Sequence, residues 1–402
     1  MLSTLTAPQM LVVTELDEPF LPLPDDLLVN LRDSRGAVDA LLEALPAQWP
    51  NANMQLPDSA TGPALQAAFL VMSHLGGKML LFQGSAPSLG AGKFKAREAL
   101  AAYGTEREAA LRNPEDPFFK RFAAEASRQQ ITLDVFVAAP GPVDLASLAA
   151  IPRYTCGQVN YYPGFYAARD GARLTADVTR NLSRPTAWEA VMRIRCSRGL
   201  RISSFHGHFF NRSTDLLALP TCDPDKTFAV QIAHEETMVS GAVGFVQCAL
   251  LYTNSNGERR IRVHTLCLPV TGDLAEMYRA SDGGATAALL AKLAVEKALM
   301  SKLDETRAAL QAKLAGALKE YRLLAGAGAR APNALVYPES MRFLAAHALG
   351  LVKCTAFRGG GREVNADERT AALHALMEAP ADAALSTAYP DVFALHDPAA
   401  AG

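Results

Sequence analysis

The cysteines of this sequence lack the spacing of a metal-binding or redox motif, because no C-x-x-C pair and no tight cluster occurs. Scattered thiols exclude a disulfide framework and a zinc knuckle, and they indicate reduced side chains in a cytosolic environment. The sequence also has no run of about 18 apolar residues, so it predicts no membrane-spanning helix. Its first residues carry no basic region of the kind that opens a signal peptide. The six cysteines stand at 156, 196, 222, 248, 267 and 354.

The sequence also has no large excess of positive or negative charge. The chain has 39 Lys and Arg against 41 Asp and Glu, which gives a formal net charge of −2. No overall field would therefore draw it to nucleic acid or to an anionic membrane, and any such attraction must come from a local patch. What is present is apolar: 50% of the 402 residues are hydrophobic, enough for two or three domains with separate cores.

Recognisable catalytic motifs are absent too. The sequence has no G-x-S-x-G elbow and no cysteine in a nucleophile signature, which argues against covalent catalysis by a hydrolase or transferase. The segment Gly90–Lys93 contains a Gly-Lys pair, but Pro87 stands where a phosphate-binding loop needs glycine and Phe94 where it needs Ser or Thr. We therefore predict a surface loop at this segment and no catalytic residue in the chain.

The histidines predict no metal site. His206 and His208 would face the same side of a strand, but the sequence shows no third ligand for them. His234 begins an His-Glu-Glu sequence that fails the H-E-x-x-H pattern, because Met238 stands in the place of the second histidine. Ordinary hydrogen-bonded histidines account for these residues.

The first half of the chain has the pattern of an α/β layer. Asp25 or Asp26 is a suitable N-cap for the helix-like stretch 26–45, and a second such stretch covers 117–129. Strands alternating with helices are typical of βαβ units and a mainly parallel sheet. The apolar segments that predict strands are 10–13, 68–72, 78–83 and 131–138.

From about Thr186 the apolar period shifts toward two, which favours an antiparallel sandwich or barrel. The segments 246–253 and 259–268 predict a hairpin joined across 254–257. Beyond 271 the composition turns to Ala, Leu, Lys and Glu, and the leucine spacing over 285–324 predicts helices. Asn365, with Glu368 three positions later, predicts the start of a further helix.

Two groups of residues in the β-rich part are candidates for binding. Arg260, Arg262 and His264 alternate along a predicted strand and would share one face. That face is either a solvated outer surface or a basic groove that meets acidic peptides. Phe210 and Arg212 would also share a side if regular strand spacing holds. They could grip a short peptide, or they could be a half-buried phenylalanine beside a salt-bridged arginine.

The string HGHFFNRSTD at 206–215, followed by GERRIR at 257–262, resembles the cargo-adaptor subunit of the COPII inner coat. Other matching pieces, from FLPLPDDLLVNL to the closing YPDVFALHD, extend the resemblance over essentially the whole chain. The resemblance implies a multidomain protein with α/β, β and α parts. These are a von Willebrand A-like trunk at 1–170, an antiparallel β-sandwich at 171–270, an all-helical domain at 271–386 and the start of a gelsolin-like domain at 387–402.

The resemblance also implies the binding residues. Leu250 matches an apolar residue of the family's main cargo-peptide pocket, and Phe210 with Arg212 matches a pair at a second cargo site. On this hypothesis Arg212, together with Arg260 or Arg262, would pair with acidic groups of the signal. The family's zinc ribbon, disordered N-terminal tail and first trunk strands are absent from this sequence, as is nearly all of the gelsolin-like domain. We therefore expect no cofactor in this chain, a truncated protein, and unpaired sheet edges that favour aggregation.

The implied function is selection of cargo without catalysis during transport from endoplasmic reticulum to Golgi. The implied partners are the GTPase-activating subunit of the inner coat, the Sar-type small GTPase through that complex, the cytosolic tails of membrane cargo and, peripherally, the membrane surface. Nucleic acid is not among them. The expected location is the cytoplasm, at endoplasmic reticulum exit sites and on COPII vesicles. The alternatives are a coat scaffold that binds no cargo and an α/β hydrolase or transferase.

Overall fold

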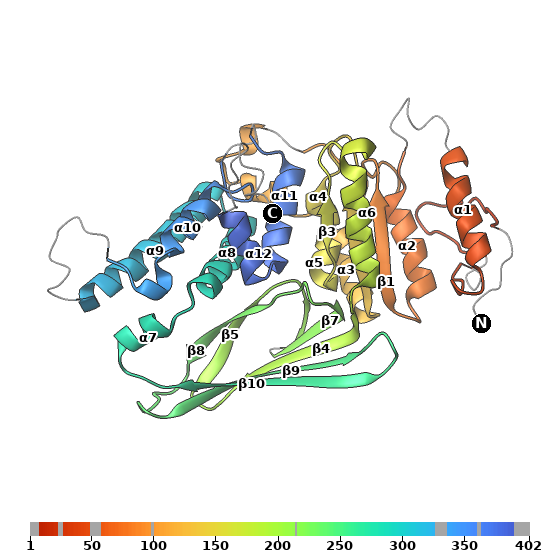
Figure 1. The fold of residues 1–402 in the computed structure, drawn as a ribbon. Coiled ribbons are helices and arrows are strands. Elements are labelled where there is room, and N and C mark those ends of the chain that lie inside the picture. The colour runs from red at the N-terminus through yellow and green to blue at the C-terminus, as the bar shows by residue number, and fades with distance from the viewer. Residues whose placement is uncertain are drawn as a thin grey trace, which may run out of the picture. The chain divides into compact units, whose positions relative to one another are not determined.

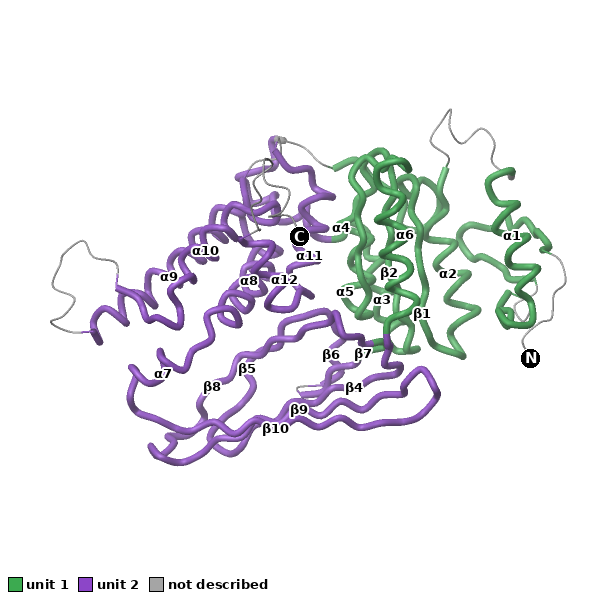
Figure 2. Tube along the Cα trace, in the orientation of Figure 1, with its two compact units in different colours: residues 1–97, 114–184, 219–221 green, residues 98–113, 185–218, 222–402 purple. Residues whose placement is uncertain are grey.

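The computed structural model describes residues 8–22, 27–48, 58–97, 100–213, 215–325, 336–359 and 363–389. The chain forms two compact units (Figure 2). Unit 1 comprises 1–97, 114–184 and 219–221, and unit 2 comprises 98–113, 185–218 and 222–402. The predicted start of a gelsolin-like domain lies mainly in 390–402, outside the described residues, as do the two predicted N-cap aspartates near position 25.

Unit 1 is built on the predicted parallel sheet, with strand order β1-β2-β3. The strands are β1 Gly77–Gln83, β2 Ile131–Val137 and β3 Val159–Tyr161. Every residue of β2 is buried, because the strand lies between two neighbouring strands and helices cover the sheet. The helices of this unit are α1 Arg35–Gln48, α2 Thr61–Met72, α3 Pro117–Arg128, α4 Leu145–Leu148, α5 Ala150–Thr155 and α6 Ala167–Ser183 (Figure 1).

Two of the predicted strands in this unit were wrong, and one predicted helix begins later than expected. Residues 68–72 end α2, because a short apolar run fits a helix as well as a strand and here it continues a segment of good helix formers. Residues 10–13 form no strand. The helix predicted from 26 begins at Arg35, and the Asn30 side chain accepts from the Arg32 amide at 2.9 Å. Such local bonds hold the backbone in turns and compete with a helix.

A charged network is buried beside β2. Asp134 is 1% exposed and accepts from the Gln158 amide and from Asn181 Nδ2, both at 2.7 Å. Lys78 Nζ lies 3.5 Å from the same carboxylate and 3.3 Å from Asn181 Oδ1. These bonds tie β1, β2 and α6 together, and they satisfy a charge that would otherwise be costly to bury. The predicted loop at Gly90–Lys93 is confirmed, since these residues form neither helix nor strand, but it is not wholly on the surface because Gly92 is buried close to Phe119.

Unit 2 contains the predicted antiparallel β-sandwich. A five-stranded sheet has the order β10-β9-β4-β7-β6, and β5 pairs with β8 in a second sheet. Residues 219–221, in the second half of β7, group with unit 1. The strands are β4 Ala187–Cys196, β5 Leu200–His206, β6 Phe210–Ser213, β7 Leu216–Cys222, β8 Ala229–His234, β9 Val243–Thr253 and β10 Arg259–Pro269.

The predicted hairpin is confirmed as β9 and β10. In the loop between them, Asn254 Oδ1 accepts from the amides of Asn256 and Glu258, at 3.0 and 2.9 Å. Gly257 has a φ of +82°, a conformation that glycine adopts without steric cost. The turn therefore uses the chemistry that the sequence Asn-Ser-Asn-Gly supplies.

The rest of unit 2 is helical, as predicted, and none of the helices in the described ranges is long and apolar enough to cross a membrane. Asn365 caps α11, accepting from the Glu368 amide at 2.7 Å. A core of mainly Ala and Leu residues joins the helices, with Phe357 fully enclosed in it. The helices are α7 Leu274–Ala280, α8 Gly283–Met300, α9 Leu303–Ala325, α10 Leu344–Lys353, α11 Ala366–Glu378 and α12 Ala381–Ala388.

Buried cationic side chains donate hydrogen bonds to backbone carbonyls at the ends of two of these helices. Arg112, from the short 3-10 helix at 108–112, donates to Ala298 O at 2.7 Å and to Ser301 O at 2.8 Å, at the end of α8. Lys292 donates to the carbonyls of Met377 and Ala379 at the end of α11. The last carbonyls of a helix have no partner within it, and the helix dipole there favours positive charge.

Candidate functional site

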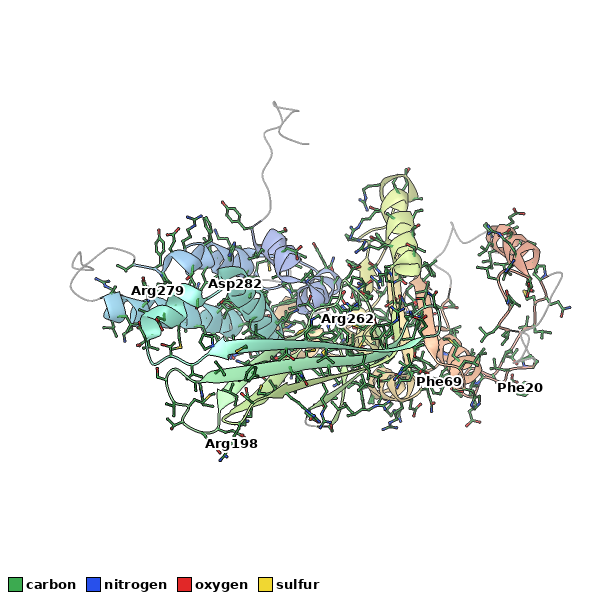
Figure 3. All side chains as sticks on the ribbon, turned by 60° about the horizontal axis from the view of Figure 1, so that its bottom comes forward. Phe20, Phe69, Arg198, Arg262, Arg279 and Asp282 are labelled. Carbon is green, nitrogen blue, oxygen red and sulfur yellow. The ribbon has the colours of Figure 1, made fainter. Side chains whose placement is uncertain are left out.

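The structure places Leu250, Arg260 and Arg262 on one face of the five-stranded sheet. Leu250 on β9 is directly opposite Arg262 on β10 and opposite Met192 on β4. Side chains of directly opposed residues in antiparallel strands project to the same face, so these three form a row across the sheet. Arg260 is two residues before Arg262, opposite Tyr252, and shares the face. Figure 3 shows Arg262 on the outer strand.

Burial falls along this row from the centre of the sheet to its edge. Met192 is 8% exposed, Leu250 is half-buried and Arg262 is exposed. The row therefore leads from the buried Met192 to the partly exposed Leu250, which lies next to a cation. An extended peptide could bury one apolar side chain against Leu250 and place a carboxylate on the guanidinium.

The two arginines of the row differ in their electrostatic environment. Arg260 Nε donates to Glu258 Oε2 at 3.0 Å. The hydrogen bond between these side chains is the largest cause of the lowered pKa of Glu258 and of the raised pKa of Arg260. Among the residues that the structure describes, the Arg262 side chain has no hydrogen-bond or ion-pair partner. Arg262 is thus the cation better placed to meet an incoming carboxylate, while Arg260 is engaged at the hairpin turn.

The strand β10 adds a second means of holding a peptide. It is the last strand of its sheet in the described part of the chain, and all eleven of its residues are exposed. Edge strands carry backbone donors and acceptors that can pair with an added extended segment. Main-chain pairing of this kind would give affinity, and the row at Leu250 would give selectivity.

Phe210 and Arg212 are not part of this row. They lie on β6, at the opposite edge of the sheet from β10. The register between β6 and β7 shifts between Asn211 and Ser213, so Arg212 is the extra residue of a bulge. The sequence predicted that Phe210 and Arg212 share one side of the strand if the strand spacing is regular. The bulge interrupts that spacing. A bulge redirects a side chain, and here Phe210 is half-buried while Arg212 is exposed.

The two histidines that the sequence grouped together have separate environments. His206 ends β5, and its Nδ1 lies 2.8 Å from Glu296 Oε1 on α8. This agrees with an ordinary hydrogen-bonded histidine. His208 lies beyond the strand, and it contacts His374 and Glu378 on α11. Sequence reasoning missed these two residues, although an His-x-x-x-Glu spacing on a predicted helix was a signal that both share one face.

Three domain families match the chain in consecutive segments. The Sec23/Sec24 trunk domain matches residues 1–182, the Sec23/Sec24 beta-sandwich domain matches 187–271 and the Sec23/Sec24 helical domain matches 282–386. Their order agrees with a parallel α/β layer, an antiparallel sandwich and a helical part.

Individual proteins narrow the match. The chain is 51% identical over 395 residues to the protein transport protein SEC24 A of Arabidopsis thaliana, covering 98% of this chain, and 40% identical over 396 residues to human Sec24B, covering 97%. A crystal structure of the human COPII-coat protein Sec24c superposes with a TM-score of 0.87 at 30% identity, over 95% of this chain and 49% of the other. The chain belongs to the Sec23/Sec24 family, on the Sec24 side of it.

The chain spans less than half the length of these relatives. It covers 38% of the Arabidopsis protein and 30% of human Sec24B. The matched part includes every candidate binding residue that the sequence predicted, from Phe210 to Arg262.

Proposed function

We propose that this chain is a cargo-recognition part of a COPII coat. It reads short sorting peptides on the cytosolic tails of membrane proteins during transport from endoplasmic reticulum to Golgi, and it transforms nothing covalently. The observation that carries the proposal is the row formed by Met192, Leu250 and Arg262, an apolar surface that ends in an exposed arginine at an open sheet edge. Membership of the Sec24 family supports it.

Recognition of this kind is weak for each copy. One apolar anchor and one charge-assisted hydrogen bond give a Kd on the order of micromolar or higher. Many coat copies on one membrane would raise the effective affinity, because the second and later contacts form within one assembly. Phe210 and Arg212 would form a separate second site at the other edge of the sheet.

The partners follow from the same proposal. The trunk would dock on the GTPase-activating subunit of the inner coat, and the Sar-type GTPase would hold the pair on the membrane at exit sites of the endoplasmic reticulum. The proposed peptide recognition needs no cofactor, because complementary shape and charge supply it.

Fluorescence anisotropy with labelled acidic peptides that contain one apolar residue tests the main site. Leu250→Asp should weaken binding by about tenfold or more, since it places a carboxylate where the peptide's own apolar and acidic groups must lie. Arg262→Ala should weaken binding by a similar factor and should remove most of its dependence on salt.

Matched controls are available on the opposite face of the same strands. Leu251→Asp makes the same change one residue further along β9, and Arg259→Ala removes an arginine of β10 that faces away from Leu250. Both should leave peptide affinity within about twofold of the wild type. Equal binding by all variants would leave only a scaffold role, and turnover of a small substrate that one side-chain change abolishes would indicate an enzyme.

A further inference from the structure

Three side chains from distant parts of the sequence meet in unit 2 beside the end of α11. His208 comes from the link between β5 and β6, and His374 and Glu378 are four residues apart on α11, so they share one face of that helix. The two histidines are 3% and 6% exposed, and the Glu378 side chain is 14% exposed. They are two imidazoles and a carboxylate, a donor set that binds transition metals.

The donor atoms are close enough to converge on one ion. A ring nitrogen of each histidine and a carboxylate oxygen of Glu378 all lie within 4.8 Å of one another. His208 Nδ1 is 3.7 Å from Glu378 Oε2, and the two imidazole centroids are 3.9 Å apart. Ligands of a tetrahedral Zn²⁺ at about 2.0–2.1 Å are about 3.4 Å from each other. Side-chain rotations that move the donor atoms by about one ångström would therefore bring them to the spacing that a tetrahedral ion requires.

We propose that His208, His374 and Glu378 form a binding site for a divalent transition metal, best suited to Zn²⁺. Nitrogen ligands favour Zn²⁺ over Mg²⁺ and Ca²⁺, which prefer oxygen alone. Three protein ligands leave a fourth tetrahedral position for water. This site lies on the sandwich and on α11, and it is independent of the peptide row on β9 and β10.

Lys226 sets the affinity of this site. Its ammonium lies 2.6 Å from Glu378 Oε2, and its side chain is 2% exposed. A carboxylate has two oxygens and can accept from Lys226 while it binds a metal, but the ammonium repels a second cation nearby. We therefore expect moderate affinity in the wild type and tighter binding when Lys226 is neutralised.

Glu378 is also reached from solvent. It lines a pocket of about 450 Å³ together with Asp225, Cys354 and Thr355. The pocket thus opens the Glu378 carboxylate to solvent beside Asp225. An ion would approach the group from the Glu378 side.

Binding would act as a staple within unit 2. The ion would link the segment after β5, which belongs to the sandwich, to α11 of the helical part. Any ligand that binds the folded state and not the unfolded state raises stability by mass action. Zinc should therefore raise the thermal midpoint of unit 2 in proportion to the logarithm of its concentration.

The test uses the whole chain purified without a polyhistidine tag. Equilibrium dialysis against ZnCl₂ with elemental analysis measures stoichiometry, and Co²⁺ in place of Zn²⁺ reports a tetrahedral nitrogen and oxygen site through its visible absorption. We expect one ion per chain and a higher thermal midpoint in Zn²⁺. A chain that is folded by circular dichroism yet takes up neither ion at ~10-fold molar excess would overturn the proposal.

Variants locate the ion. His208→Asn and His374→Gln remove a ligand with little change in volume, and each should weaken zinc binding by about 10- to 100-fold. His264→Asn, on the exposed strand β10, is the matched control and should bind as the wild type does. Lys226→Met should tighten binding. Unchanged affinity in both ligand variants, or in Lys226→Met, would contradict the placement, and the wild-type cobalt spectrum decides the matter if a variant does not fold.

Discussion

At the scale of single residues, the helical part depends on cations that are buried at helix ends. Lys292 is 1% exposed, and its ammonium donates to two carbonyls at the end of α11. Burial lowers its pKa from 10.5 to about 8, and the nearby Glu378 offsets only part of this effect. The carbonyl bonds reduce the cost of the buried charge but do not remove it.

This pKa predicts a dependence of stability on pH. Between about pH 8 and pH 10.5 the unfolded chain holds a proton on Lys292 that the folded chain has lost. The contribution of Lys292 to the free energy of unfolding should therefore increase as the pH rises through that window, by about 3 kcal/mol in total.

Urea denaturation from pH 7 to pH 10.5, comparing the wild type with Lys292→Met, measures this contribution. The variant lacks the titrating group, so the difference between the two proteins should change across the window and stay constant below it. All other groups titrate in both proteins and cancel. A difference that is flat from pH 8 upward would show that Lys292 keeps its ordinary pKa.

At the scale of elements, β10 has apolar side chains on both of its faces although it is an edge strand. On the face away from Leu250, Ile261 is 69% exposed and Val263 is 51% exposed. An exposed apolar edge is a template for pairing with another copy of the chain. We predict that any self-association of this chain through a sheet edge occurs at β10.

We expect the double variant Ile261→Lys/Val263→Lys to self-associate less than the wild type. Charged side chains on an edge oppose pairing, and exposed positions change the free energy of unfolding by only about 0.5 kcal/mol. Light scattering against protein concentration measures the effect. Thr265→Lys adds charge to the same face without removing an apolar side chain, and it should have the smaller effect. Equal scattering by the double variant and the wild type would exclude this edge as the site of association.

At the scale of the whole molecule, the two units are not continuous in sequence. Residues 98–113 belong to unit 2 although unit 1 residues flank them on both sides. Arg112 holds this segment in unit 2. Its side chain is buried, donates to the Ala298 carbonyl near the end of α8, and forms a buried ion pair with Glu108. Burial lowers the pKa of Arg112, and Glu108 opposes that shift.

Replacement of this arginine should destabilise one unit and not the other. Arg112→Met leaves the Glu108 carboxylate buried without its cation, which costs about 3–5 kcal/mol. Hydrogen exchange should become faster in α8 and the 3-10 helix at 108–112, with the strands of unit 1 unchanged. Arg107→Met changes an exposed arginine of the same segment and serves as the control. Equal acceleration in both units would mean that they unfold together.

The class of each part of the protein could be predicted from local features of the sequence. Strand period, turn residues and capping residues are local properties, so β2, the β9–β10 hairpin and the start of α11 were predictable from a few neighbouring residues. Alternation along β10 also indicated that Arg260 and Arg262 share a face. The function and the residue Leu250 came from resemblance to a family and not from periodicity.

The contacts between residues distant in sequence became known from the structure. It placed Leu250 opposite Arg262, put Phe210 and Arg212 at the other edge of the sheet with Arg212 in a bulge, and brought His208 to His374 and Glu378. It also decided that residues 68–72 are helix, since a short apolar run takes whichever form buries it. Pairing between strands and burial between elements depend on contacts distant in sequence, and no local pattern encodes them.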